Sequence, residues 1–210
     1  MNNKELRNNI ELRSTETIKA VDNEKMIVEG YALRFNTLSN DLGGFVETIS
    51  PQALKDTDLS DVRCLIDHDS SKVLGRTTSK TLDLKVDDEG LYFRCQLPDT
   101  SYSRDLYENI RVGNINQCSF GFILDDDGDT IEKRDDGMFK RTLNKIRSLF
   151  DVSVVTYPAY NDTDVAPALR SIEAVKEKEQ EEIRKREEEL AERRKQTELL
   201  KLQLDLLKTK

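Results

Sequence analysis

The distribution of turn-forming and aromatic residues divides this 210-residue chain into two parts. All 9 glycines, all 4 prolines and all 13 aromatic residues lie before Ser171. Residues 171–210 therefore differ in kind from the rest of the chain. The first 170 residues are enough for a core that removes about 70% of the unfolded surface from water. We therefore predict a globular domain over residues 1–170 and a separate tail over residues 171–210.

The tail has the composition of one long charged helix. It carries 11 basic and 11 acidic residues and consists mostly of strong helix formers. A heptad seam can be drawn through Ile183, Leu190, Thr197 and Leu204. Because Arg186 and Arg193 occupy the other seam position, only residues 199–207 are convincingly apolar. Two interpretations stay open: a solvated helix, or a helix that binds a partner or a second copy of the chain.

Composition and charge argue against several classes of protein. No apolar run approaches the roughly 20 residues that a membrane span needs. The first residues lack the apolar stretch of a secretory signal, so we expect a chain that starts in a reducing cytosol. The three cysteines, Cys64, Cys95 and Cys118, have no framework spacing, which favours free thiols. The net charge of −8, carried wholly by residues 1–170, argues against nucleic-acid binding, which needs a basic surface.

Alternating apolar and polar residues dominate the first 170 residues. Strands are predicted at residues 26–35, 62–68, 81–86, 91–97, 116–124, 138–146 and 151–157. One helix is predicted from Thr100 or Ser101 to Gly113, and a shorter one at residues 52–55. Many short strands with few helices indicate a mostly β fold, a barrel or sandwich with helical decoration.

Three residues far apart in the sequence have the chemistry of a nucleophilic hydrolase. His68, the only histidine, lies where a strand gives way to a polar loop, a common place for functional side chains. Alternation places Ser119 and Gly121 on the strand face opposite the apolar side chains. Asp151 leads an apolar strand, where a buried carboxylate needs a partner such as a protonated histidine. Ser119 as nucleophile, His68 as general base and Asp151 as the group that orients the imidazole would form a triad.

Each of these residues also has a simpler explanation. A lone histidine is often incidental, and a Ser-x-Gly segment in a strand is often a bulge or a bend. An aspartate at the start of a strand is often exposed. Spacing alone does not bring the three side chains together, so the triad is a hypothesis at this point.

Other chemistries fit the sequence less well. If Ser119 faces His68, alternation turns Cys118 to the other face, which disfavours a cysteine nucleophile. Cys64 and His68 would lie about 13 Å apart in an extended strand, too far to share a zinc ion. Residues 125–129 resemble a calcium loop in charge alone, because the glycine of an EF-hand is missing. No glycine-rich phosphate loop is present, so we expect neither a metal nor a cofactor.

Seven segments between Ile10 and Leu169 carry a resemblance to a known family. They are residues 30–36 (GYALRFN), 41–47 (DLGGFVE), 67–69 with 73–77 (DHD and VLGRT), 90–93 (GLYF), 97–102 (LPDTSY), 118–122 (CSFGF) and 149–160 (LFDVSVVTYPAY). On these segments the chain resembles the prohead serine proteases of tailed bacteriophages, which mature the capsid. The resemblance implies the β-barrel of herpesvirus assemblin, with His68 as general base and Ser119 as nucleophile.

The resemblance leaves more than one candidate for the third catalytic residue. Assemblin-type relatives use a second histidine, which this chain lacks, whereas phage members often carry Glu or Asp at the position of Asp151. Asp67 and Asp69 are competitors, although residues adjacent to a histidine usually point away from its ring. Backbone N–H groups would form the oxyanion hole, and Gly75 and Arg76 are the candidates.

The resemblance also implies a function. We expect a serine endopeptidase that acts inside the assembling prohead in the host cytoplasm. Its partners would be a scaffolding protein or the scaffolding region of the major capsid protein, and it would also cleave itself. The tail would dock onto scaffold and be removed by self-cleavage, with self-association left open. The alternative is a non-enzymatic assembly or scaffolding protein that uses the tail for association.

Overall fold

The computed structural model describes residues 10–16, 18–157 and 166–208. The chain divides into two compact units, Met1–Ala168 and Leu169–Lys210. The first unit, called the body below, contains all of the described strands, whereas the described part of the second lies within helix α3 (Ala166–Lys208).

The largest sheet of the body has five strands in the order β1-β9-β12-β5-β6. These strands are β1 (Glu11–Glu16), β5 (Arg63–Ile66), β6 (Asp69–Arg76), β9 (Gln117–Leu124) and β12 (Ile146–Val155). β12 runs parallel to β5, and the other neighbours are antiparallel. β9 and the second half of β12 are buried at nearly every residue, as expected for apolar strands covered on both faces.

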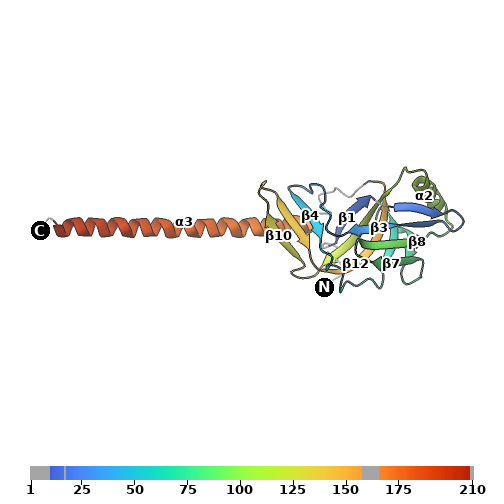
Figure 1. Ribbon diagram of the computed structural model, residues 1–210, viewed down its shortest axis with the longest axis horizontal. Helices are drawn as coiled ribbons and strands as arrows, with labels where there is room; N and C mark the ends of the chain where they lie inside the picture. The colour runs from blue at the N-terminus through green and yellow to red at the C-terminus, as the bar shows by residue number, and fades with distance from the viewer. Residues whose placement is uncertain (1–9, 17, 158–165, 209–210) are drawn as a thin grey trace. The chain divides into compact units, whose positions relative to one another are not determined.

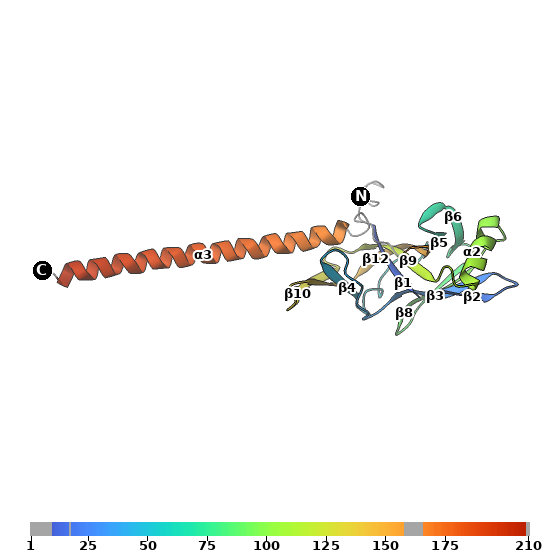
Figure 2. The ribbon, with the colours of Figure 1, turned by 90° about the horizontal axis from the view of Figure 1, so that it is seen from above.

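Two smaller sheets and a helix complete the body. One sheet has the order β2-β3-β8-β7, formed by β2 (Ile18–Asp22), β3 (Ile27–Arg34), β8 (Gly90–Gln96) and β7 (Leu82–Val86). The other has the order β10-β11-β4, formed by β10 (Asp129–Lys133), β11 (Phe139–Leu143) and β4 (Phe45–Ile49). In both ribbon views β4 and β10 lie at the opposite end of the body from helix α2 (Ser101–Arg111) (Figures 1 and 2).

The body is mostly β, as the sequence predicts. Its core is built from apolar side chains of the sheets and of α2, among them Phe93, Phe120 and Leu106. Each fully buried side chain of this size contributes about 1.5–3 kcal/mol to folding. The described strands pair into three separate sheets and not into one closed ring, so the predicted barrel is not confirmed.

Helix α2 forms where the sequence predicts it. The hydroxyl of Thr100 accepts a hydrogen bond from the backbone N–H of Ser103 at 3.3 Å and so caps the first turn. Leu106 and Ile110 share the face that packs into the core. After the helix, Gly113 adopts φ +84°, a left-handed conformation in which glycine carries no steric penalty.

Several predicted elements differ from the structure. The short helix predicted at residues 52–55 is wrong, because the local hydrogen bonds there span three residues, as from Lys55 N–H to the carbonyl of Gln52. These bonds form turns without a helical ladder. Strands β1, β2, β4, β6 and β10 were not predicted. The strand predicted from Asp151 begins five residues earlier, at Ile146.

A buried ionic cluster joins β1 to the three-stranded sheet. Arg141 on β11 is 1% exposed and donates hydrogen bonds to Glu11 on β1 at 2.9 Å and to Glu47 on β4 at 3.0 Å. Arg13 on β1 donates to the same Glu47 carboxylate at 2.6 and 2.8 Å, and Asp129 on β10 accepts from Arg141. Burying such charges costs several kcal/mol each, so the cluster is stable only because opposite charges pair at hydrogen-bond distance.

Helix α3 confirms the predicted long C-terminal helix. Its described surface carries ion pairs such as that of Lys185 with Glu181 at 3.5 Å, and it exposes Ile183 and Leu190. The side chains of residues 199–208 are outside the described residues, and with them the whole of the apolar segment predicted at residues 199–207. No described helix combines the length and apolar character that crossing a membrane requires.

Candidate active site

His68 lies in a two-residue turn between β5 and β6. The turn consists of Asp67 and His68, and the flanking residues Ile66 and Asp69 pair with each other. Both turn residues have positive φ, +48° and +57°, as in a type I′ hairpin turn. A left-handed conformation costs a non-glycine residue about 1–2 kcal/mol, although Asp and His tolerate it better than most. The residues after His68, predicted as a polar loop, form strand β6.

Ser119 lies in the middle of β9, where the sheet register fixes its neighbours. It pairs with Ser14 of β1 on one side and with Ser153 of β12 on the other. Ser119 is fully buried. Cys118 and Phe120, its neighbours in sequence, belong to the hydrophobic core, so the predicted separation of Ser119 from the apolar face is correct.

Asp151 lies within β12 and not at its start. It is 9% exposed, so the alternative of an exposed strand-end aspartate is wrong. The register shifts between Leu149 and Asp151, and after this irregularity Asp151 pairs with Gly121 of β9. A Cβ atom at position 121 would lie 2.6 Å from Asp151 Oδ2. Gly121 therefore makes room for the carboxylate.

The structure brings the three predicted side chains together around one imidazole. His68 Nε2 lies 2.8 Å from Ser119 Oγ, and His68 Nδ1 lies 2.7 Å from Asp151 Oδ1. Because a carboxylate only accepts hydrogen bonds, Nδ1 carries the ring proton and donates a hydrogen bond to Asp151, while Nε2 accepts one from the Ser119 hydroxyl. In this tautomer the imidazole is arranged to withdraw the proton of Ser119.

A fourth side chain completes the arrangement. Ser153 Oγ donates a hydrogen bond to Asp151 Oδ1 at 2.6 Å, and Ser153 is fully buried. The same oxygen, Oδ1, therefore accepts hydrogen bonds from Ser153 and from His68, and the two donors together hold it in place. The sequence signal for this contact is the Asp-x-Ser spacing, because residues two apart in a strand share a face.

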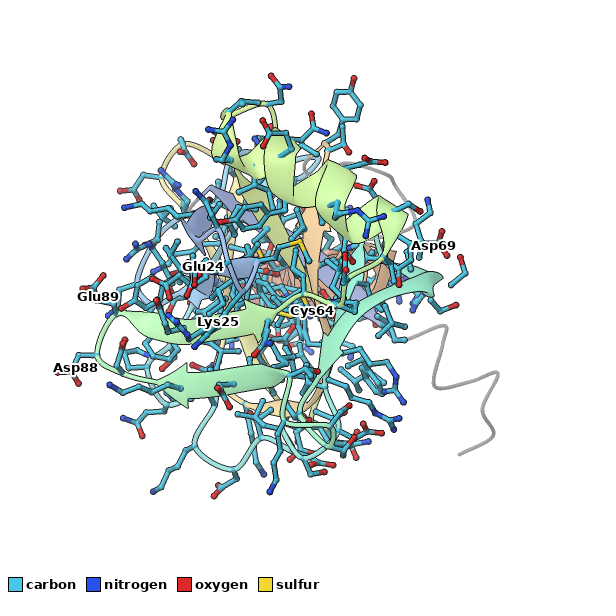
Figure 3. The ribbon with its side chains drawn as sticks, turned by 90° about the vertical axis from the view of Figure 1, so that its right-hand side faces the viewer. Glu24, Lys25, Cys64, Asp69, Asp88 and Glu89 are labelled. Carbon is cyan, nitrogen blue, oxygen red and sulfur yellow. The ribbon has the colours of Figure 1, made fainter. Side chains whose placement is uncertain are left out.

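The two aspartates next to His68 are engaged elsewhere. Asp67 accepts hydrogen bonds from the backbone N–H of Thr156 at 2.8 Å and from its hydroxyl at 3.3 Å. Asp69 accepts from the backbone N–H of Ser71 at 2.9 Å and from its hydroxyl at 2.6 Å. In Figure 3 Asp69 lies at the outer edge of the body, whereas Cys64 lies in its interior. It is Asp151, and neither of these competitors, that contacts the imidazole.

The cysteines are poorly suited to nucleophilic chemistry. Burial raises the pKa of the Cys118 thiol, and the negative charge of Asp151 raises it further. The pKa of the Cys64 thiol is raised chiefly by a hydrogen bond with Cys95 and, second, by burial. These thiols stay protonated, whereas a cysteine nucleophile must be a thiolate. Among the described residues, no three His, Cys, Asp or Glu side chains are placed to hold a metal ion.

The residues considered for the oxyanion hole have other roles. The backbone N–H of Arg76 donates to Thr81 Oγ1 at 3.0 Å and is therefore occupied. Gly75 pairs with Cys64 of β5 inside the sheet, and a Cβ atom on it would lie 2.5 Å from Cys95 Sγ in the core. The suggestion of Gly75 and Arg76 as oxyanion donors is thus not supported.

Comparisons with known proteins give the context of this site. The sequence model of the caudovirus prohead serine proteases matches residues 8–178. A search of curated proteins finds no match. Among solved structures, the capsid assembly protease gp21 of bacteriophage T4 matches with a TM-score of 0.43 and 11% sequence identity, over 69% of this chain and 96% of that chain. The family match spans more than half of the sequence and includes every residue of the candidate site.

Proposed function

The chain belongs to the caudovirus prohead serine protease family, and we propose that His68, Ser119 and Asp151 form its catalytic triad. The observation that carries this proposal is the pair of hydrogen bonds on the two sides of the His68 ring, at 2.8 Å to Ser119 and 2.7 Å to Asp151. An aligned hydroxyl, imidazole and carboxylate are the parts that activate a serine in unrelated proteases.

The proposed mechanism follows from the donor and acceptor at each contact. Ser119 Oγ attacks the carbonyl carbon of the scissile peptide bond, and His68 Nε2 takes the hydroxyl proton. Asp151 stabilises the imidazolium that forms, and Ser153 holds the carboxylate in place. The imidazolium then gives its proton to the leaving amine as the C–N bond breaks, which leaves an acyl group on Ser119. A water molecule, deprotonated by His68, hydrolyses this ester and restores the hydroxyl.

Substitution of the nucleophile tests the proposal. Ser119→Ala, co-expressed with the major capsid protein of the same phage, should leave that protein uncleaved. Ser103→Ala is the matched control, because Ser103 is also a fully buried serine but lies in α2. It should cleave the capsid protein as the parent does. Unchanged cleavage by Ser119→Ala would remove Ser119 from the mechanism.

The substrates and place of action also belong to the proposal. We infer that the enzyme cleaves the scaffolding protein, or the scaffolding region of the major capsid protein. It would act inside the assembling prohead in the host. We also infer that it cleaves its own chain. Since the family consists of prohead proteases, a purely structural assembly role is no longer favoured. Self-cleavage predicts shortened products of the parent chain that are missing from the Ser119→Ala preparation.

The C-terminal helical tail has a role of its own, separate from catalysis. We assign residues 1–170 to the protease domain and residues 171–210 to a segment that docks onto scaffold. Exposed Ile183 and Leu190, seven residues apart on a charged helix, support this role, because a partner helix could cover both.

A further inference from the structure

We propose that Asp67 is a positioning residue for the general base. Its carboxylate ties the turn that carries His68 to the end of β12, the strand that carries Asp151. This inference rests on the proposed triad. It assigns a role to Asp67, which the sequence offers beside Asp69 as an alternative to Asp151 for the third catalytic residue. The hydrogen bonds between the Asp67 carboxylate and Thr156 are called the latch below.

Three hydrogen bonds join the turn to β12 and to Thr156, the residue that directly follows this strand. The latch supplies two of them, from the backbone N–H of Thr156 at 2.8 Å and from its hydroxyl at 3.3 Å. The backbone N–H of Asp67 also donates to the carbonyl of Val154 at 2.9 Å. The turn is therefore fixed to residues that lie only a few positions beyond Asp151 in the sequence. The distance between the His68 imidazole and the Asp151 carboxylate is therefore set by these nearby hydrogen bonds.

The turn needs such a connection because it is the least constrained part of the site. Ser119 and Asp151 lie on strands whose ladder hydrogen bonds define their positions. His68 lies outside any ladder, in a turn whose two residues both have the unfavourable left-handed conformation. Without the latch, the turn could relax and carry the ring away from Oδ1 of Asp151.

Asp69 provides an internal comparison. It is the other neighbour of His68 and also accepts hydrogen bonds from a backbone N–H and a hydroxyl. Those donors belong to Ser71 on β6, the strand that Asp69 itself begins. Removing the Asp69 carboxylate therefore leaves the connection to β12 intact.

Nuclear magnetic resonance can test the latch without a substrate. Because His68 is the only histidine, the ring of a histidine-labelled sample gives a single set of signals. In the Ser119→Ala background, which avoids self-cleavage, the Nδ1 proton bonded to Asp151 should give one low-field signal. Asp67→Gly removes the carboxylate and adds no strain to a left-handed turn. This variant should exchange the Nδ1 proton with water at least tenfold faster.

Two further variants separate positioning from folding. Asp67→Asn keeps the shape of the side chain and one acceptor oxygen, so it should restore most of the signal that Asp67→Gly loses. Asp69→Ala should leave the signal unchanged. An Nδ1 signal in Asp67→Gly with the exchange rate of its parent would overturn the latch.

Cleavage of the co-expressed capsid protein gives the second measurement, in chains that keep Ser119. Asp67→Gly should cleave about tenfold more slowly, a smaller loss than the roughly 10²-fold that a full 1 Å misplacement can cost. Asp67→Asn should lie between Asp67→Gly and the parent, and Asp69→Ala should stay within about twofold. Cleavage by Asp67→Gly at the parental rate contradicts the latch alone, whereas cleavage by Ser119→Ala contradicts the triad.

Discussion

Replacing Gly121 with alanine would place a methyl group against the carboxylate of Asp151. The added Cβ atom would lie 2.6 Å from Asp151 Oδ2 and 3.2 Å from Leu12 Cδ2. Since ordinary contacts begin at 3.4 Å, the carboxylate would have to withdraw by about 0.8 Å, the difference between 3.4 and 2.6 Å. Oδ1 of the same group is held by His68 at 2.7 Å and by Ser153 at 2.6 Å, so the withdrawal must lengthen at least one of these bonds.

The expected loss of activity follows from this displacement. A misplacement of 1 Å at a catalytic group costs about 10²-fold in rate, and loss of the orienting acid costs about 10⁴-fold. Gly121→Ala should therefore lower the rate of capsid-protein cleavage by about 10²-fold to 10⁴-fold. It should also lower the free energy of unfolding by about 1–3 kcal/mol, the usual cost of overpacking a filled interior.

Gly75→Ala is the matched control for Gly121→Ala. A Cβ atom at position 75 would lie 2.5 Å from Cys95 Sγ, so the clash is as severe. Gly75 lies in the same sheet as Gly121, but the neighbours of its added Cβ would be Cys95 and Thr81 and not Asp151. Both variants should lose stability, measured by denaturant unfolding, but only Gly121→Ala should lose cleavage per folded molecule. Equal cleavage rates for the two variants would refute the reasoning that Gly121 exists to seat the carboxylate.

Three further predictions concern the rest of the chain. Ser153→Ala removes one of the two donors to Asp151 Oδ1 and should slow capsid-protein cleavage about tenfold; the lost buried hydrogen bond should also lower the melting temperature by a few degrees. An unchanged cleavage rate would contradict its role. Arg141→Met leaves three buried or half-buried carboxylates with fewer partners. It should lower the free energy of unfolding, measured by urea titration, by about 3–5 kcal/mol. A loss below about 1 kcal/mol would contradict this prediction. Deletion of residues 171–210 should preserve cleavage in co-expression but abolish incorporation into proheads, so normal incorporation would argue against docking by the tail.

The fold could be predicted where inward positions are apolar. β8 and most of β3 follow the expected alternation, and their inward residues form the core. β9 is also a strand where one is predicted, although it is buried on both faces. β1 and β4 could not be predicted in this way, because inward positions on these strands are Glu11, Arg13 and Glu47 of the ionic cluster. A prediction from hydrophobic periodicity places charged residues such as these at exposed positions. Their burial is stable only because opposite charges pair in the three-dimensional structure, which the local sequence does not show.

The candidate site could be predicted in its chemistry but not in its geometry. A single histidine and the Ser-x-Gly and Asp-x-Ser spacings were visible in the sequence, and the family resemblance is confirmed by the match over residues 8–178. The meeting of Ser119, His68 and Asp151 depends on β12 lying between β9 and β5. It also depends on the register shift that sets Asp151 opposite Gly121. Neither the strand order nor the shift follows from local patterns of residues.

The site thus depends on two kinds of structural constraint that fail in different ways. Ser119 and Asp151 are placed by the register of β9 against β12, and a slip of one residue would turn Ser119 into the core. Such a slip would disturb every pair along both strands, so the stability of the whole sheet protects these two positions. His68 has no ladder to protect it, because it lies in the turn between β5 and β6. Its alignment depends on a few local hydrogen bonds, so changes in the turn can abolish activity while the fold remains intact.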